Sequence, residues 1–274
     1  MICCVATVKG GDGKTTTSLM ISSILALSGK KVLCIDLDIQ NSLSFALGIK
    51  YEDCLTENIT TFINSEKINP FKISIGNINL DLIPSTFKLS SMRTISLPHF
   101  KNVLYKSGVV DNYDYIVIDT SPSYDNFFLT ASFASDVIIY PICARSVFSQ
   151  KCLFDTIEFL SVDCPTALDK IYLLPTFYES LKDEDKVINY IISKYGDNSV
   201  LKPIKFSNKY QYINDSLSYL AKKSFSNVLE DYYNSFSSLF SLNSNFLKRN
   251  KENNNENTYY EDNERDTFDE DNDN

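Results

Sequence analysis

A glycine-rich loop near the start of the chain lies between an apolar run and a helical pattern, and it constrains the fold most. Residues 2–8 are apolar or β-branched, which favours a buried strand. Apolar side chains recur at helical spacing over 14–28, and Gly29 is a typical helix stop. Residues 31–36 form a second apolar run that ends on Asp36. This succession predicts a strand-helix-strand unit, which requires a parallel sheet.

Further apolar runs continue the alternation of strand and helix. The expected strands span 80–84, 115–119, 136–141 and 170–175. The expected helices span 126–135, 147–162 and 184–195, and residues 209–247 favour one or two more. Nearly continuous apolar strands must be covered on both faces. The sequence therefore predicts a doubly wound, mostly parallel α/β sheet with helices on both faces, as in P-loop NTPases.

The composition limits the kinds of site and location to expect. No apolar run is long enough for a membrane span. The seven cysteines include no Cys-x-x-Cys pair, and His99 is the only histidine, which argues against a zinc site. Unpaired thiols in apolar runs are typical of a reducing compartment. We therefore expect a cytoplasmic protein.

The charge divides the chain into a body and a tail. The net charge is −9 in all, and the ten acids and two bases from Asn250 onward account for −8 of it. Residues 1–249 therefore carry about −1, and we expect them to form one folded domain. Residues 250–274 have too few apolar side chains to form a core, so we expect a disordered acidic tail. A near-neutral body leaves room for a local basic patch.

The glycine-rich loop has the chemistry of a phosphate-binding Walker A loop. Gly10, Gly11 and Gly13 allow the backbone to curl so that successive N–H groups point at an anion. Lys14 is expected to reach the β- and γ-phosphates, and the Thr15 hydroxyl to bind Mg²⁺. The general pattern G-x-x-x-x-G-K-[ST] is not fully met, since Val8 stands at its first glycine. A second lysine, at position 9, follows directly.

Three acids at strand ends suit phosphoryl transfer, which needs a metal and a positioned nucleophile. Asp119 ends an apolar run and suits the Walker B role of holding Mg²⁺ through water. Asp36 and Asp38 follow the second run, and alternation places them on the same side of it. We expect one of this pair to orient the attacking water and the other to help hold the metal.

These motifs together resemble the ParA/MinD family of deviant Walker A ATPases. The loop from Lys9 to Thr17 is similar to the family's KGGxGKTT, and the segment 36–40 to its D-x-D-P-Q. The segment 113–123 is similar to its Walker B motif, Y-D-x-I-x-I-D-x-P-P. The chain looks most like short plasmid-partition ParA proteins, which lack an N-terminal DNA-reading domain. The loop residues expected to contact nucleotide are Lys9, Gly10, Gly11, Asp12, Gly13, Lys14, Thr15 and Thr16.

The resemblance implies a mechanism built on a homodimer that encloses two ATP molecules. It implies that Lys9 crosses to the partner's nucleotide and that Asp38 orients the hydrolytic water. Thr15 would bind Mg²⁺ directly, with Asp119 in the outer shell. The ATP-bound dimer would bind double-stranded DNA without sequence preference, in association with the nucleoid. A ParB-like partner would stimulate weak basal hydrolysis and so release the dimer.

The chain departs from the family pattern at several positions. Asp12 fills a loop position that is usually small or apolar, and an acid there is unfavourable beside phosphates unless it points to solvent. Ile39 replaces the usual proline, and Asn41 replaces a glycine, so the turn around Asp38 is expected to differ. Thr120-Ser121-Pro122 has one proline where the family often has two.

Four lysines in the C-terminal part of the fold are candidates for DNA contacts, because non-specific binding requires cations that neutralise phosphates. They are Lys194, Lys202, Lys205 and Lys209. The same lysines could equally be ordinary surface charges. MinD-type relatives attach to membranes through a basic amphipathic helix. This chain has the acidic stretch 250–274 instead, which argues against a membrane partner.

Other functions on the same fold stay open from the sequence. A MinD-like ATPase could position proteins rather than DNA. A ligase could use the same loop to activate a small substrate, and a protein without hydrolysis could act as an adaptor. Relatives that carry iron–sulfur clusters use paired cysteines, which this chain lacks.

Overall fold

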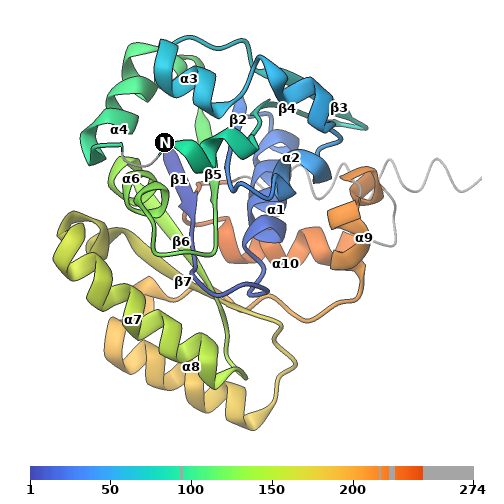
Figure 1. Ribbon diagram of the computed structural model, residues 1–274. Helices are drawn as coiled ribbons and strands as arrows, with labels where there is room; N and C mark the ends of the chain where they lie inside the picture. Colours follow the sequence, from blue (N-terminus) through green and yellow to red (C-terminus); the bar gives the residue numbers. More distant parts are fainter. Residues whose placement is uncertain (93–94, 216, 222–225, 243–274) are drawn as a thin grey trace, which may run out of the picture.

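A seven-stranded sheet forms the centre of the computed structural model, which describes residues 1–92, 95–215, 217–221 and 226–242 (Figure 1). The strand order is β3-β4-β2-β5-β1-β6-β7, and only β3 runs antiparallel to its neighbour. The strands are β1 Ile2–Val5, β2 Val32–Leu37, β3 Phe71–Ile75, β4 Ile78–Ile83, β5 Tyr115–Thr120, β6 Val137–Cys143 and β7 Ile171–Thr176.

Helices lie on both sides of the sheet (Figure 1). They are α1 Lys14–Leu27, α2 Ser42–Ala46, α3 Ile59–Ser65, α4 Leu97–Lys106, α5 Val109–Asn112, α6 Asn126–Ala134, α7 Val147–Asp163, α8 Lys182–Tyr195, α9 Lys209–Asp215 and α10 Ser226–Phe236. Short 3₁₀ turns occur at Tyr51–Leu55, Phe87–Ser91, Pro165–Lys170, Asp197–Ser199 and Leu217–Ala221. The predicted doubly wound, mostly parallel fold is confirmed. Within the described part of the chain, no helix has both the length and the apolar character needed to cross a membrane.

Most of the expected elements form, with small shifts at their ends. All six expected strands are present, and the first is shorter than predicted because residues 6–8 already belong to the loop. Strand β3 was not expected; it pairs with β4 across a tight turn at Gly76 and Asn77. Within the expected helical stretch 209–247, the described residues form α9, a 3₁₀ turn and α10. The stretch 250–274 lies outside the described residues.

Alternation along the central strands divides the core between the two faces of the sheet. On β1, Cys3 and Val5 belong to the core shared with α1 and α10, whereas Ile2 and Cys4 belong to the core shared with α4 and α6. Successive strand residues point to opposite faces, so a buried strand must be apolar on both. This requirement explains why the strands read as continuous apolar runs in the sequence.

The register of three strands brings the start of the glycine-rich loop beside two acids. Strand β5 lies between β2 and β1, and Asp119 pairs with Asp36 on one side and with Val5 on the other. Strands β1 and β6 are neighbours, but the chain continues from β1 toward β2 and from β6 toward β7, on opposite sides. The connections after these two strands therefore run apart, and doubly wound folds bind their ligands at such a point.

Helix α10 closes the core on the α1 face through a row of aromatic rings. Phe236 is fully buried and stacks against Tyr232 and Phe240, with ring centroids 6.0 and 5.5 Å away. The Tyr232 hydroxyl lies 3.2 Å from the Thr17 hydroxyl on α1. The C-terminal helix is therefore part of the same core as the helix that begins at the loop.

We expect Phe236→Ala to lower the free energy of unfolding by about 3–5 kcal/mol, because it removes a buried ring and leaves a cavity. Urea denaturation followed by circular dichroism measures this change. Phe45→Ala is the matched control, since that ring is 73% exposed and its loss should alter stability by about 0.5 kcal/mol or less. Equal effects of the two substitutions would contradict the assignment of α10 to the core.

Candidate functional site

The loop after β1 has the backbone conformation that a phosphate-binding loop requires. Gly11 and Gly13 adopt positive φ values of 88° and 91°, a region that L-residues with side chains avoid. Helix α1 begins at once, with the Thr17 N–H donating to the Gly13 carbonyl at 2.8 Å. The N-terminal end of α1 therefore faces the space that the loop encloses, and its dipole favours an anion there.

Lys14 lies at the base of this loop among acids. Its side chain is buried, and desolvation lowers the pKa of its amine, while the nearby carboxylates of Asp119, Asp38 and Asp12 oppose that shift. A cation so placed has little hydration to lose when an anion arrives. Lys14 is therefore positioned to bind a phosphate group that lies within the loop.

Asp119 connects the sheet to the first turn of α1. Its two carboxylate oxygens accept hydrogen bonds from the hydroxyls of Thr15 and Ser18, both at 2.8 Å. Burial raises the pKa of Asp119 to about 6, and the hydrogen bonds from Ser18 and Thr15 oppose this shift. Sequence reasoning had not identified Ser18, although its position one turn after Thr15 places both hydroxyls on one side of the helix.

The same arrangement fits Mg²⁺ bound together with a nucleotide. The Thr15 hydroxyl donates its hydrogen to Asp119, so its oxygen lone pairs remain for a cation. Hard oxygen ligands of this kind suit Mg²⁺, which normally keeps several waters and shares substrate phosphates. Among the described residues, no cluster of three or more histidine, cysteine or acidic side chains could hold a metal by itself.

Asp36 holds the turn that follows β2. One of its oxygens accepts from the Asp38 N–H at 3.0 Å, and the other accepts from the N–H and hydroxyl of Ser44 at 2.9 and 2.7 Å. Burial raises the pKa of Asp36 to about 7, and Asp119 adds to this rise. The metal role predicted for Asp36 stays a prediction. Its contacts give it a second role, in positioning Asp38.

Asp38 lies at the tip of this turn, close to Lys14. Its carboxylate accepts a hydrogen bond from the Gln40 N–H at 3.0 Å. Burial raises the pKa of Asp38, while the Gln40 hydrogen bond and the charge of Lys14 oppose the rise. Asn41 takes a positive φ of 56°, and its N–H donates to the Asp38 carbonyl at 2.9 Å. Asparagine tolerates this conformation, so it can stand where the family has glycine.

Asp12 does not point to solvent, which was the sequence-based condition for an acid in this loop. Its side chain is fully buried. The Lys9 amine contacts Asp12 Oδ1 at 2.6 Å, and the Ser149 hydroxyl donates to Asp12 Oδ2. The condition is therefore not met, and these partners compensate the charge from within the protein.

A pocket beside the loop could accept the base of a nucleotide, and sequence reasoning did not find it. It has a volume of about 240 Å³ and lies against Gly13 and Thr16. Its walls come from the end of β7 and from the segment that leads into α9, with Phe177, Phe206 and Tyr210 among the lining rings. Flat apolar walls next to a phosphate loop suit a heteroaromatic base. The only sequence signal was the run of aromatic residues after β7.

Arg145 holds one wall of this pocket in place. Its guanidinium contacts the carboxylates of Glu179 and Glu184 at 2.9 and 3.1 Å, and it donates to the Phe177 carbonyl at 3.1 Å. Phe177 and Ser180 both have positive φ values, 55° and 63°, in a region that residues other than glycine rarely adopt. The ion pairs of Arg145 therefore stabilise a strained loop at the edge of the pocket.

The four lysines predicted to contact DNA do not form a single cluster. Lys194 lies near the end of α8, over the ring of Phe154 at 4.3 Å, and Lys209 begins α9. Figure 1 shows α8 and α9 on different parts of the surface. Lys205 lines the base pocket, and Lys202 is exposed in the loop before it. Their role in DNA binding stays a prediction.

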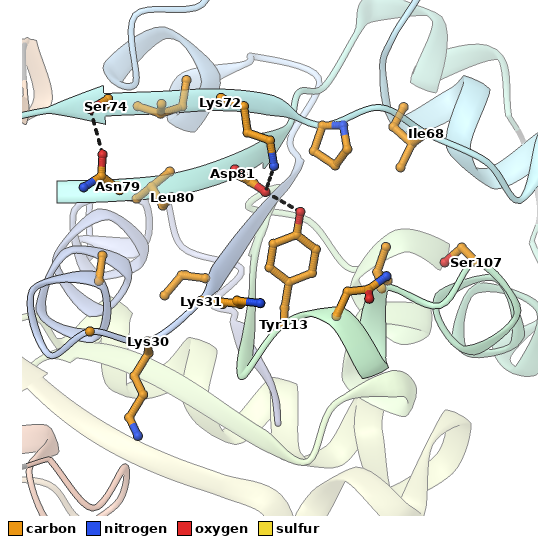
Figure 2. A pocket seen from close by; sticks show the side chains of 17 residues that line it. Lys30, Lys31, Ile68, Lys72, Ser74, Asn79, Leu80, Asp81, Ser107 and Tyr113 are labelled. Carbon is orange, nitrogen blue, oxygen red and sulfur yellow. Dashed lines mark hydrogen bonds and ion pairs between the residues drawn. The ribbon is translucent and has the colours of Figure 1, made fainter.

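A larger hollow, of about 770 Å³, lies at the opposite edge of the sheet (Figure 2). Its lining includes Lys31 at the start of β2 and Tyr113 just before β5. Figure 2 shows Lys72 and Tyr113 both reaching Asp81. No residue of the glycine-rich loop lines this hollow. The candidate site is therefore the smaller pocket together with the loop at the carboxyl ends of the strands.

Comparison with known sequences identifies relatives over most of the chain. A family model described as an AAA domain matches residues 1–170. An uncharacterized protein of Methanocaldococcus jannaschii is 35% identical over 207 residues, which cover 71% of this chain and 73% of that protein. The sporulation initiation inhibitor protein Soj of Bacillus subtilis is 34% identical over 148 residues, which cover 52% of this chain and 57% of Soj. The match thus spans little more than half of Soj.

Comparison with solved structures shows the same fold over most of the chain. Apo McdA from Cyanothece superposes with a TM-score of 0.72 at 24% identity, covering 87% of this chain and 98% of McdA. A plasmid partition protein of Borrelia burgdorferi, solved with AMPPNP, gives a TM-score of 0.68 at 23% identity. That alignment covers 88% of this chain and 98% of the other. At these identities the likeness establishes the fold.

We expect Lys14→Ala to raise the dissociation constant for ATP by about 100-fold, because a charge-assisted contact to phosphate is worth about 1.5–3 kcal/mol. Titration with a fluorescent ATP analogue measures it. Lys31→Ala is the control, since that lysine lies at the opposite edge of the sheet and its removal should leave affinity unchanged. Unchanged affinity in Lys14→Ala would refute the assignment of the loop.

Proposed function

The chain belongs to the ParA/MinD family of P-loop ATPases, and on that premise we propose that it is a partition ATPase acting on plasmid or chromosomal DNA. The observation that carries the proposal is the loop after β1. It combines the curled glycine backbone, the buried Lys14 and the second lysine, Lys9. An ordinary P-loop protein needs only Lys14, so the additional lysine supports a function that involves a second subunit.

ATP and Mg²⁺ are the proposed cofactors. The residues proposed to hold them are Lys14 for the phosphates, Thr15 for the metal, and Asp119 through a water in the outer shell. Mg²⁺ would neutralise the charge that develops on the phosphates during transfer. The apolar pocket beside Gly13 would hold the adenine base. An AMPPNP-bound relative supports this choice of ligand.

The proposed reaction is hydrolysis of ATP to ADP and phosphate. A water attacks the γ-phosphorus in line with the bond from that phosphorus to the β–γ bridging oxygen. This bond breaks, and the bridging oxygen leaves as part of ADP. Asp38 would orient that water, because it lies close to Lys14 and is held there by the Asp36 turn. Lys14 would balance the charge on the transferring group.

The proposed active form is a homodimer with ATP between the two subunits. Large apolar side chains stand exposed around the carboxyl edge of the sheet, where the loop lies. Ile39 after β2 is 43% exposed, and Val147 and Phe148 at the start of α7 are 79% and 62% exposed. An exposed apolar surface around a polar site favours contact with another protein. Pairing through this face would bring Lys9 of each subunit toward the nucleotide of the other.

Double-stranded DNA and a ParB-like protein are the proposed partners, with the nucleoid in the cytoplasm as the place of action. Two subunits would double the positive charge supplied by Lys194, Lys202, Lys205 and Lys209. Binding through phosphates carries no sequence preference and weakens with salt. A ParB-like partner would stimulate hydrolysis and so release the dimer from DNA.

A second candidate is a positioning ATPase whose cargo is a protein assembly. A likeness to the maintenance of carboxysome distribution protein A of Synechococcus elongatus, 33% identical over 147 residues, favours it. Both functions require the same ATP-dependent dimer. They differ in the cargo, which is determined by a partner that recognises the dimer.

We expect Asp38→Ala to lower the rate of ATP hydrolysis by about 100-fold or more, because the variant cannot position the attacking water. The dimer formed with ATP should then persist for hours, whereas that of the unchanged protein should decay as ATP is consumed. Phosphate release and mass by light scattering measure the two effects. Asp169→Ala, which removes an exposed acid before β7, is the control. Normal turnover in Asp38→Ala would exclude the proposed role.

We expect the protein to bind a random-sequence duplex with ATP and Mg²⁺, and to bind weakly with ADP or without nucleotide. Affinity should fall steeply as salt rises, because counterions are released from the phosphates. Fluorescence anisotropy of labelled DNA measures binding, with the mass of the protein followed in the same samples. An ATP dimer that ignores DNA would favour the protein-positioning function. ATP binding without a dimer would favour a ligase or an adaptor.

A further inference from the structure

We propose that Asp12 is a positioning residue that retains Lys9 within its own subunit and so restrains the pairing of two subunits around ATP. The inference rests on the proposed function, because Lys9 is the lysine that would cross to the partner's nucleotide. It concerns the regulation of that crossing, which depends on the unusual acid in this loop.

The contacts show Asp12 as the fixed end of an ion pair and Lys9 as its free end. Asp12 is held on three sides, by the Lys9 amine, by the Ser149 hydroxyl and by the Thr176 hydroxyl, which donates to its backbone carbonyl at 3.1 Å. The Asp12 side chain has no exposed surface, whereas that of Lys9 is 21% exposed. When the pair separates, Lys9 can move into solvent, but Asp12 must stay buried.

The direction of Lys9 follows from this asymmetry. Its amine lies 2.6 Å from a carboxylate only three residues further along the same loop, so the side chain folds back over its own subunit. To reach a phosphate on a partner, Lys9 must give up that contact. Asp12 would then be a buried carboxylate with one hydroxyl donor, from Ser149, and with Lys14 near it but in no ion pair with it, which is less favourable than the paired state. The ion pair therefore opposes dimer formation.

The same contact would hasten separation after hydrolysis. A phosphate and the Asp12 carboxylate compete for one ammonium group, and the competition shifts toward Asp12 when the γ-phosphate leaves. Asp12 is also joined to two other segments of the site. Ser149 lies in the first turn of α7, beside the exposed Phe148, and Thr176 precedes Phe177 of the pocket beside the loop. Loss of the Ser149 contact would leave Asp12 more dependent on Lys9 and so strengthen the restraint.

Asp12→Asn tests the proposal because it keeps the shape of the side chain and an acceptor for Ser149 but removes the charge. The first measurement is the rate at which an amine-reactive reagent modifies Lys9 in nucleotide-free protein, followed by peptide mass spectrometry. The second is the dissociation constant of the dimer with AMPPNP and Mg²⁺. We expect modification to rise about threefold or more and the dimer to tighten about tenfold.

Asp183→Asn is the matched control. Asp183 forms an ion pair with Lys186 that has the same three-residue spacing and the same 2.6 Å distance, but both side chains are exposed on α8. Neither the modification of Lys9 nor the dimer constant should change in this variant. Lys9→Ala combined with Asp12→Asn should lose the gain in dimer strength, because the gain acts through Lys9. Ser149→Ala removes the hydroxyl that supports Asp12 once Lys9 has left, so it should slow the modification of Lys9 and weaken the dimer. This opposite change tests the restraint if Asp12→Asn does not fold.

The outcomes separate the inference from the proposed function. Unchanged modification of Lys9 in Asp12→Asn would show that the carboxylate does not hold the amine. Faster modification with an equal or weaker dimer would show that Asp12 orients Lys9 for crossing rather than restraining it. Either result overturns the inference and leaves the ATP-dependent dimer intact. Normal nucleotide binding with no dimer in any variant would instead overturn the proposed function, and the restraint with it.

Discussion

The hydrogen bonds between Asp119 and the first turn of α1 are the constraint on which the site depends. They join the central strand of the sheet to the helix that begins at the glycine-rich loop, through the hydroxyls of Thr15 and Ser18. The parallel register then sets Asp119 beside Asp36, whose own hydrogen bonds hold the turn of Asp38. One chain of contacts thus runs from the sheet to the residue proposed to orient water. A shift of β5 by one residue would point Asp119 toward the opposite face, away from α1 and from Asp36.

Charge balance explains why so many ionisable groups can lie buried around an anion site. Lys14 lies near the carboxylates of Asp119, Asp38 and Asp12. Burial raises the pKa values of Asp36, Asp38 and Asp119. Each acid accepts hydrogen bonds from hydroxyl or amide donors of the protein, as buried charges require. A phosphate group would enter as one more anion around Lys14. The metal that accompanies it would restore the balance.

The sequence predicts the parts of the site that are continuous in the chain and misses those that are assembled from distant segments. The βαβ pattern located the loop, Lys14 and Thr15, because strand, glycines and helix follow directly. The base pocket and the Arg145 contacts bring together segments after β6, after β7 and before α9, and spacing alone contains no information about that contact. Strand β3 was missed although apolar and polar residues alternate along it. Only one of its residues is buried, so it lacks the continuous apolar run by which the other strands were recognised.

Two of the departures from the family pattern illustrate the same difference. Asn41 stands in place of glycine in a left-handed backbone conformation that asparagine tolerates, and this reason is local. The acid at position 12 is compatible with the fold only because Ser149, 137 residues away, donates to it and Lys9 folds onto it. The sequence identified Asp12 as unusual but could not reveal its burial or its contact with Ser149. Its consequence for function follows from those partners. Any state in which Lys9 leaves Asp12 must offset the free-energy cost of a buried acid without its ion-pair partner.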